Sequence, residues 1–453
     1  MRPIVFILAV LLFSCSEPET TSTVSNDADE AYAGGTTTSF DQTSKAFTFP
    51  IANISAANLE AHNAGDAAFE ATFVSPPALI NGGLGPLFNN VSCVSCHNND
   101  GRAKPLTNAG AFGGLLFRIS SPGVDARGGP AAMPGFGTQI QTHSIFGVEP
   151  EMEIQISYTE ISGKFADGTD YSLQQPTYSI TNPYMPVPVN AMISPRIANS
   201  NFGLGLLEAV SEKTILNLAD ENDTNGDGIS GKANYVYDFA SDKMMLGRFG
   251  WKASQPTLIQ QSAAAANNDM GVTSSYFPNE TSLGQAQDVT AHGPEMSDEE
   301  LRGITVYLQT LAPPARRNVS DATVMKGKTM FVQAQCATCH TPKMQTGSHT
   351  IAELSNQTIR PFTDLLLHDM GDGLADNRPD YLADGREWRT APLWGIGLTK
   401  IVNGHTNFLH DGRARNLTEA ILWHGGEAEN SKQLFLKMGA ADRNSLIKFI
   451  ESL

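Results

Sequence analysis

Two cysteine pairs, each followed at once by a histidine, are the residues of this chain best suited to do chemistry. They are Cys93–Val94–Ser95–Cys96–His97 and Cys336–Ala337–Thr338–Cys339–His340. Two thiols at this spacing can form thioethers with the two vinyl groups of one haem, and the adjacent histidine then ligates the iron. We therefore predict two covalently attached c-type haems, with His97 and His340 as proximal iron ligands.

A zinc site or a thiol-redox pair is the alternative interpretation of a C-x-x-C motif. Zinc takes about four protein ligands, and thiol-redox chemistry does not require the histidine that follows each pair here. The chain has five cysteines, and the fifth is Cys15. No cysteine remains for a disulfide framework, so the pattern favours haem.

The N-terminal residues predict export from the cytoplasm. Arg2 precedes an apolar run, Ile4–Phe13, that is too short to span a bilayer. Leu12–Phe13–Ser14–Cys15 resembles the lipobox of bacterial lipoproteins. We expect residues 1–14 to be a signal peptide and Cys15 to be lipidated, with ordinary signal cleavage nearby as the alternative. The predicted location is the periplasm or cell envelope, with the lipid anchored in a membrane, the outer one by preference.

The length and composition of the chain indicate how many folded domains could hold the two motifs. Hydrophobic residues make up 41% of the 453 residues, which is enough for hydrophobic cores. The net charge of −17 excludes nucleic acid as a partner. Residues 15–45 are small and polar, so we expect a disordered tether there. We predict two haem units, one at 46–317 and one at 318–453.

Aromatic spacing repeats in the two predicted units. Phe88 lies five residues before Cys93, and Phe331 lies five residues before Cys336. Glycine precedes each phenylalanine, and in c-type cytochromes such a stretch forms the first helix. We therefore expect one helix around each phenylalanine.

A closing helix is expected in each unit as well. Ser297 and Glu300 form a capping-box pattern, and apolar residues follow at helical spacing until Pro313–Pro314. Residues 446–453 predict a second helix with an apolar face. The predicted fold class is mainly α, with two cytochrome c-like haem domains, the first carrying long loop insertions or a short sheet.

A family resemblance becomes specific near the C-terminus. Phe408–Leu409–His410–Asp411–Gly412–Arg413 and Trp423–His424–Gly425–Gly426 resemble the second haem domain of bacterial di-haem cytochrome c peroxidases and of the related tryptophan-modifying di-haem enzymes. In that family the axial ligand lies fourteen residues after the motif histidine and is usually methionine. The resemblance implies that His424 is the sixth ligand of a bis-His second haem. His410 then lies beside the haem without ligating it.

A more extensive resemblance covers almost all of the mature chain. It is to the di-haem oxidoreductases, also labelled C-x-x-C-motif thiol oxidoreductases, which are largely assigned as peroxidases. The stretches that carry it are Ser194–Ile197, Gly203–Ala209, Gly247–Ala253, Pro314–Arg317, Leu366–Gly371 and Glu387–Thr390. Because all four motif cysteines are assigned to haem, none is left for thiol chemistry.

The resemblance implies that peroxide binds at the first haem, whose sixth ligand the sequence does not identify. An acid–base group must then assist O–O cleavage on the open side of the iron. The candidates are Glu208, Arg196 and His143, each of which also has a structural interpretation as a paired or satisfied side chain.

Other polar and sulfur-containing residues are secondary candidates near the haems. His62, Met270 and Met370 are further ligand candidates that fit equally well as core residues. Arg196, Arg248 and Arg389 are candidates to pair with haem propionates, or else form surface salt bridges. The four tryptophans are best interpreted as packing near haem: Trp251, Trp388, Trp394 and Trp423.

A calcium-loop pattern occurs at residues 223–234. Asp223, Asn225 and Asp227, with the backbone of Ile229, have the spacing of oxygen ligands for one hard cation. The twelfth position is Asn234 rather than Glu, which predicts a weaker site than an EF-hand. A plain Asx/Gly turn is the alternative.

These features together predict an exported di-haem oxidoreductase that reduces peroxide at the first haem. Electrons are expected to enter at the bis-His second haem from a small periplasmic cytochrome or cupredoxin. A non-enzymatic electron carrier with two saturated haems is the main alternative. A third interpretation is an oxidase that modifies a partner protein at long range.

Overall fold

A computed structural model describes residues 29–105, 113–289 and 293–453. The predicted signal peptide and the lipidation site at Cys15 lie outside the described residues. Across the three described ranges, none of the helices combines the length and the apolar character that crossing a bilayer requires.

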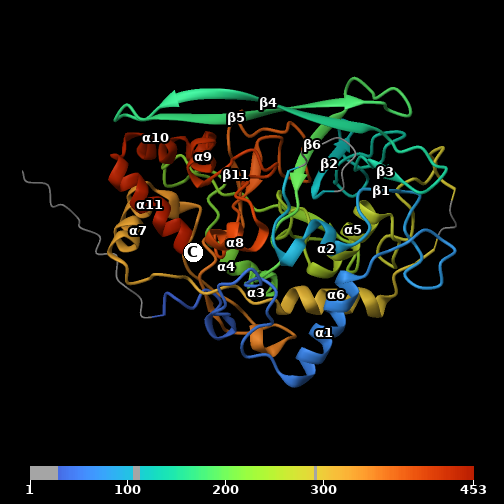
Figure 1. Cartoon of the computed structure of the whole chain (residues 1–453), viewed down its shortest axis with the longest axis horizontal. Coiled ribbons are helices and arrows are strands. Elements are labelled where there is room, and N and C mark those ends of the chain that lie inside the picture. The colour runs from blue at the N-terminus through green and yellow to red at the C-terminus, as the bar shows by residue number, and fades with distance from the viewer. Residues whose placement is uncertain (1–28, 106–112, 290–292) are drawn as a thin grey trace, which may run out of the picture.

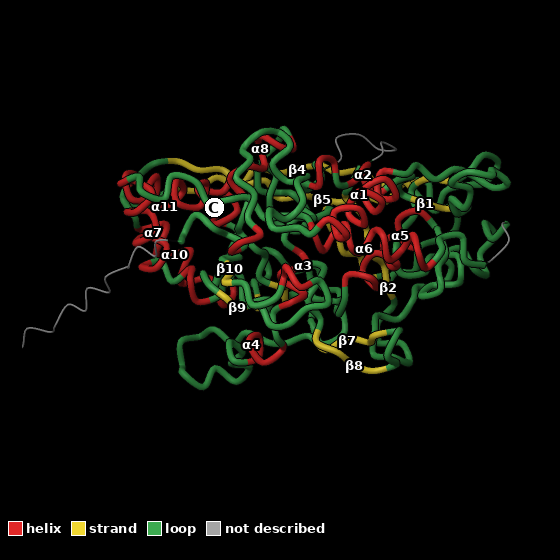
Figure 2. Tube along the Cα trace, turned by 90° about the horizontal axis from the view of Figure 1, so that it is seen from below, coloured by secondary structure: helices red, strands yellow, loops and turns green. Residues whose placement is uncertain are grey.

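Short helices and two-stranded ribbons are joined by long loops, as Figure 2 shows. Helices account for 29% and strands for 19%, so the mainly α prediction is only partly right. The elements before residue 318 are α1 (Ala56–Glu70), β1 (Leu87–Phe88), α2 (Cys93–Cys96), β2 (Leu115–Ser120), β3 (His143–Ser144), β4 (Glu153–Lys164), β5 (Asp170–Thr181), β6 (Met192–Ile197), α3 (Leu204–Ala209), α4 (Glu212–Leu216), β7 (Tyr235–Asp238), β8 (Lys243–Leu246), α5 (Leu258–Met270) and α6 (Asp298–Thr310).

Most helices after residue 318 lie at the left of Figure 1, whereas α1, α5 and α6 lie toward the right. The elements after residue 318 are α7 (Ala322–Gln333), β9 (Met344–Gln345), β10 (Thr358–Ile359), β11 (Leu367–Asp369), β12 (Glu387–Arg389), α8 (Thr399–Asn403), α9 (Leu417–Leu422), α10 (Glu429–Lys437) and α11 (Ala440–Ser452). The strands pair antiparallel as β1–β3, β2–β6, β4–β5, β7–β8, β9–β10 and β11–β12.

Two helix pairs of similar design are built around glycines. A Cβ atom on Gly65 of α1 would lie 2.1 Å from the carbonyl oxygen of Gly303 in α6, and one on Gly327 of α7 would lie 1.9 Å from that of Ser445 in α11. Only glycine allows backbones to approach so closely. One pair precedes residue 318 and one follows it.

The predicted closing helices are confirmed. Helix α6 begins with the complete Ser297/Glu300 capping box, and α11 buries Leu446, Phe449 and Ile450. The helix predicted around Phe331 is also confirmed as α7.

The helix predicted around Phe88 is wrong. Leu87 and Phe88 form strand β1, which pairs with Ser144 and His143 of β3. Gly85 lies against Gly271, where a Cβ atom would be 2.7 Å from the neighbouring Cα, and Pro86 follows it at once. This close approach and the proline favour extended backbone over a helix, so the opening helix is α1, farther upstream.

The disordered tether predicted for residues 15–45 is wrong for its described part, residues 29–45. Glu30 is buried and forms ion pairs with Arg316 and Lys328. Thr37 is fully buried, and its hydroxyl donates to the carbonyl of Gly34 at 2.8 Å. Few large apolar side chains are needed here, because ion pairs and hydrogen bonds fix the segment against the body of the protein.

A long hairpin of β4 and β5 lies along one side of the molecule and reaches α9 and α10, as Figure 1 shows. Phe165 at its turn packs against Phe435 of α10, and Arg443 of α11 bonds Asp167 at 2.8 Å. The hairpin thereby links the N-terminal part of the chain to the C-terminal helices.

The hydrophobic residues form two large buried clusters, and each draws on both sides of residue 318. One cluster contains Leu308 and Trp394, and the other contains Ile119 and Phe449. The division into units at 46–317 and 318–453 stays a prediction.

Candidate active site

One cavity of about 610 Å³ brings both C-x-x-C-H motifs together. Its size is in the range of cofactor sites, roughly 300–1,000 Å³. All six motif side chains line it: Cys93, Cys96, His97, Cys336, Cys339 and His340. We call the first three the first motif and the last three the second motif. None of these four cysteines is joined in a disulfide bond.

Both motif histidines are oriented by backbone carbonyl groups. His97 Nδ1 lies 2.6 Å from the carbonyl oxygen of Asn199, and His340 Nδ1 lies 3.0 Å from that of Phe362. Because a carbonyl only accepts, each Nδ1–H donates and each Nε2 keeps its lone pair. Burial lowers the pKa of both rings to about 4. Neutral, oriented imidazoles of this kind are suited to bind a metal.

His424 lines the same cavity and is oriented by a backbone carbonyl group as well. Its Nδ1 lies 2.7 Å from the carbonyl oxygen of Ala420 at the end of α9. Burial lowers its pKa, and its charged form would lower the pKa of His340. The structure thus places His424 in the same cavity as His340, with its Nε2 unused. Its role as an iron ligand stays a prediction.

His410 lies flat against Trp388, with ring centroids 3.9 Å apart and planes 12° apart. Burial lowers the pKa of His410 to about 4. The adjacent Asp411 bonds Arg413 at 2.8 Å and the hydroxyl of Tyr178 at 2.8 Å. The stacked ring forms part of the cavity wall, consistent with a position beside a haem.

Among the three acid–base candidates, the described cavity wall includes Arg196 and neither Glu208 nor His143. Glu208 accepts from the backbone of Leu258 at 2.8 Å and from the side chain of Gln309 at 2.6 Å. Burial opposes its ionisation, but hydrogen bonds from His349, Leu258 and Gln309 lower its pKa. This carboxylate therefore caps α5 and joins it to α6.

Of His143 and the secondary ligand candidates His62, Met270 and Met370, only the two methionines line the described cavity wall. His143 lies in β3, beside the hydroxyl of Thr142 at 3.1 Å. His62 is buried on α1, with Nδ1 2.8 Å from the hydroxyl of Thr310. Met270 and Met370 both line the cavity, so either sulfur is within the region where haem would lie.

Asp269, near the end of α5, is a cavity residue that no sequence pattern indicated. The described carboxyl groups on the cavity wall are those of Asp125, Asp269 and Asp380. Burial raises the pKa of Asp269, whose Oδ1 accepts from Gln139 Nε2 at 2.7 Å. Burial, and then the charge of Asp269, raise the pKa of the Cys93 and Cys96 thiols. Asp269 therefore lies near the first motif. No local pattern identified it, since α5 is rich in alanine and amide residues.

The three arginines predicted near propionates all line the cavity. Arg248 donates to the carbonyl oxygens of Leu207 and Val210, and Arg389 donates to those of Gly250 and Thr390. Arg196 bonds Asp380 at 2.8 Å. None of the three is a surface salt bridge.

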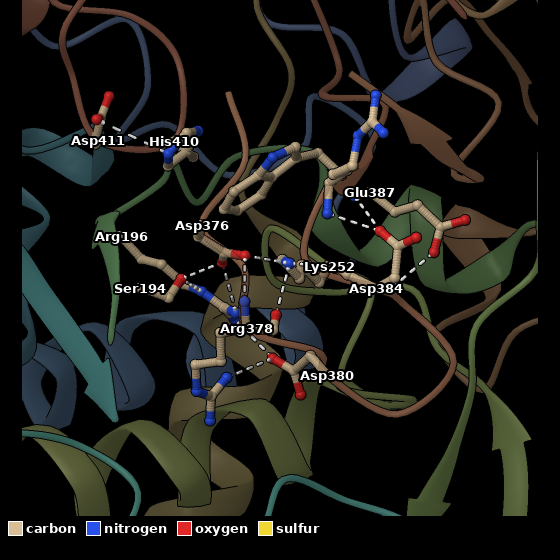
Figure 3. A network of polar contacts seen from close by, with 12 residues as sticks. Ser194, Arg196, Lys252, Asp376, Arg378, Asp380, Asp384, Glu387, His410 and Asp411 are labelled. Carbon is tan, nitrogen blue, oxygen red and sulfur yellow. Dashed lines mark hydrogen bonds and ion pairs between the residues drawn. The ribbon is translucent and has the colours of Figure 1, made fainter. Parts of the chain in front are cut away.

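A buried ionic network extends from Arg196, as Figure 3 shows. Lys252 is fully buried, and its Nζ bonds Asp376 at 2.8 Å and the carbonyl oxygens of Arg378 and Asp384. Asp376 also accepts from Ser194 at 2.5 Å. Burial lowers the pKa of Lys252 to about 8, although Asp376 opposes the shift. The network joins residues from both sides of position 318.

One cluster in the described chain has the spacing of metal ligands, and it involves the second motif. Cys339, Asp364 and His368 place their ligand atoms within 4.8 Å of one another. Burial alone would lower the pKa of His368, but hydrogen bonds to Asp364, Cys339 and Glu427 raise it well above its usual value. His368, protonated between Asp364 and Glu427, places a buried positive charge beside Cys339.

The candidate calcium loop is exposed and turns as the sequence predicted. Carboxylate oxygens of Asp223 accept from the backbone of Gly228, and Asp227 Oδ1 accepts from that of Ile229. Asn234 is not available to the loop, because its amide group bonds Lys252, Asp380 and Leu382. Calcium binding by Asp223, Asn225, Asp227 and Ile229 stays a prediction.

Residues 27–453 match the model of the family described as "Di-haem oxidoreductase, putative peroxidase". The chain belongs to this family. The family description makes it an oxidoreductase with two haems, in agreement with the two motifs that share one cavity. A search of the curated proteins found no match.

Proposed function

We propose that the protein reduces peroxide at a haem bound by the first motif, using electrons that arrive through a haem bound by the second motif. One observation carries this proposal: both C-x-x-C-H motifs open onto one cavity, and each histidine presents a neutral Nε2 to it. Bound haem supplies one-electron chemistry at iron, and two haems match the two electrons that peroxide requires.

In this proposal, different residues attach the haems, ligate the irons and donate protons. Cys93, Cys96, Cys336 and Cys339 attach the two haems through thioethers. His97 and His340 would ligate the two haem irons, and His424 would supply a further ligand to the second. Each imidazole is kept in one orientation by a carbonyl oxygen of the backbone, which prevents it from rotating out of position.

Asp269 is the carboxyl group best placed to handle protons at the first haem. Asp380 is engaged by Arg196, and Asp125 Oδ1 accepts from the backbone of Arg127 and Gly129. Asp269 faces the cavity near the first motif, and burial raises its pKa. A carboxyl group with a raised pKa stays protonated closer to neutral pH, so it has a proton to donate to a peroxide oxygen.

Export, the lipid on Cys15 and delivery of electrons by a small periplasmic cytochrome or cupredoxin belong to the same proposal. The N-terminal lipobox pattern and the absence of a cysteine outside the motifs and the lipobox support it. In this arrangement the enzyme is anchored to a membrane through lipid and meets its electron donor and peroxide on the exported side.

The test is a stopped-flow experiment on purified protein whose two haems have been reduced. Addition of hydrogen peroxide is expected to oxidise the ferrous haems rapidly, and D269N is expected to slow this step about 10²-fold or more. The control is D125N, which changes a carboxyl group bonded to its own loop. Ferrous haems that persist in the presence of peroxide contradict the proposal.

Electron transfer without peroxide chemistry is the alternative, and the position of Met270 and Met370 on the cavity wall favours it. A methionine ligand at the first haem would leave no open position for peroxide. An electron paramagnetic resonance spectrum of the ferric protein separates the two functions. A high-spin signal supports the peroxidase, and two low-spin signals support the carrier.

A further inference from the structure

Arg118 and Arg196 lie on one face of a two-stranded ribbon that borders the cavity. In the β2–β6 register, Leu116 pairs with Arg196 and Arg118 pairs with Ser194. Directly opposed residues and alternate residues of an antiparallel pair share a face. Both arginines therefore project to the same side, and both line the cavity.

The Arg118 guanidinium makes no hydrogen bond with any residue in the described ranges. Burial lowers its pKa, and the charges nearest to it are those of Asp269, Arg196 and Asp380. A desolvated cation without a hydrogen-bonded anion is costly. Its position on the wall of an internal cavity indicates that the missing partner lies within that cavity.

Two neighbouring guanidinium groups have unused donors as well. Arg196 Nη2 and Arg378 Nε are buried without a hydrogen-bond partner, and their residues are 9% and 2% exposed. Asp380 accepts from Arg196 Nη1 at 2.8 Å and from Arg378 Nη1 at 3.5 Å, and Arg196 Nε donates to Ser194 at 3.0 Å. Several donors therefore remain unsatisfied at this wall.

The local charges do not balance. The positive groups coupled to one another here are Arg118, Arg196, Lys252 and Arg378, and the carboxyl groups are those of Asp269, Asp376 and Asp380. Burial raises the pKa of Asp269, which favours its neutral form. Asp376 and Asp380 are already engaged within the network seen in Figure 3. Positive charge is therefore left over, and the group with no hydrogen bond is that of Arg118.

We propose that Arg118 and Arg196 form a binding site for a carboxylate, and that its occupant is a propionate of the haem attached to the first motif. A guanidinium group matches a carboxylate in shape and charge and pairs with it through two hydrogen bonds. This inference rests on the proposed function, because it requires haem at the first motif.

The assignment to the first haem follows from Asp269. Gln139 forms a β-bridge with Arg118, and its side chain donates to Asp269 at 2.7 Å. The backbone carbonyl of Asp269 accepts from Asn89 and Asn90, which lie four and three residues before Cys93. Arg118 is therefore connected through Gln139 and Asp269 to the segment that carries the first motif. The propionates of a haem lie at the edge away from its vinyl groups, so those of a haem attached to Cys93 and Cys96 would lie away from these cysteines, and Arg118 and Arg196 would be the residues to hold one.

The site has an electrostatic consequence for the first haem. A fixed positive charge near a haem favours the ferrous form, because reduction adds a negative charge. Arg118 therefore raises the reduction potential of the first haem, and removal of its charge lowers it.

The test is a spectroelectrochemical titration of the full holoprotein, with each haem followed through its own paramagnetic resonance signal. R118Q is expected to lower the midpoint potential of the first haem and leave that of the second unchanged. R118K keeps the charge and is expected to stay closer to the unmodified protein. The matched control is R415Q, which removes an exposed arginine paired with Glu160 and is expected to leave both potentials unchanged.

The haem content of each sample separates the two proposals. If the protein contains fewer than two covalently bound haems, the proposed function fails. If two haems are present and R118Q matches the unmodified protein, or shifts only the second haem, the propionate site is overturned. If R118Q does not accumulate, R378Q removes a neighbouring unused donor, and an unchanged first-haem potential in that variant overturns the site.

Discussion

At the scale of single residues, burial decides which groups around the cavity are charged. His97, His340 and His410 are held neutral at physiological pH because burial lowers the pKa of each to about 4. His368 is held charged by Asp364 and Glu427. Histidines of the same chain therefore take opposite protonation states, and only the neutral ones are available as metal ligands.

The identity of the residue at position 424 is expected to set the potential of the second haem. Imidazole favours ferric iron relative to a thioether ligand, so H424M is expected to raise the second midpoint potential. A spectroelectrochemical titration measures the shift. H405M makes the same change at a histidine outside the cavity wall and is expected to have no effect. A second potential that does not move in H424M would show that His424 is not a ligand.

Glu151 is expected to make stability depend on pH. It is 1% exposed, and burial raises its pKa to about 8, although hydrogen bonds from Gln141 and Gln285 oppose the shift. The folded state then binds the proton more tightly than the unfolded state, so stability falls as pH rises from about 4.5 to about 8. The difference in Tm between E151Q and the unmodified protein is expected to increase over this range.

Thermal unfolding followed by circular dichroism at pH 5, 7 and 9 measures this trend. The control is E149Q, which changes an exposed carboxylate two residues away and is expected to shift Tm equally at every pH. A Tm difference for E151Q that stays constant from pH 5 to pH 9 would contradict the raised pKa.

At the scale of elements, the turn of the β4–β5 hairpin anchors its outer end to the C-terminal helices. Phe165 is 7% exposed. Its ring contacts Tyr171 and Phe435, and Arg443 lies 3.9 Å above it. The strands add a second attachment, because Leu173 is buried in the same core cluster and Tyr178 donates to Asp411. The turn contact is the one that holds the hairpin against α10 and α11.

F165A is expected to destabilise the protein by about 3–5 kcal/mol, because it leaves a cavity in this anchor. Urea unfolding measures the loss, and limited proteolysis is expected to cut first between residues 153 and 181. F146A truncates a phenylalanine that is fully exposed, and its effect is expected to stay within about 0.5 kcal/mol. Equal effects of the two substitutions would show that the turn is not an anchor.

At the scale of the whole molecule, the buried ionic network binds the two sides of position 318 together. Ser194, Arg196 and Lys252 come from one side, and Asp376 and Asp380 come from the other. Loss of one partner leaves a buried charge without compensation, which costs more than the loss of a surface pair.

K252M is expected to lower the free energy of unfolding by about 3–5 kcal/mol, because it leaves Asp376 with an uncompensated charge. The double variant K252M/D376N is expected to recover part of this loss. K164M breaks an exposed pair with Asp170 and is expected to cost under about 1 kcal/mol. Chemical unfolding compares the three, and a cost for K252M no larger than that for K164M would contradict the role of the network.

Local patterns in the sequence determined the parts of the protein that depend on near neighbours. The C-x-x-C-H spacing identified the residues that meet at the cavity, and the capping box with its apolar periodicity identified α6. The histidine fourteen residues after His410 was found through a family resemblance, and the structure places it in the same cavity as His340. These features could be predicted because the residues involved are close along the chain or belong to a known motif.

Only the tertiary structure decided which polar side chains face the cavity. Glu208 had a conspicuous apolar context, yet it caps α5, whereas Asp269 and Arg118 had no local signal and line the cavity wall. Strands β2 and β6 are separated by more than 70 residues, so no periodicity could show that Arg118 and Arg196 share a face. Burial and charge at this site arise from the packing of distant segments, and that packing is not encoded in any short stretch of sequence.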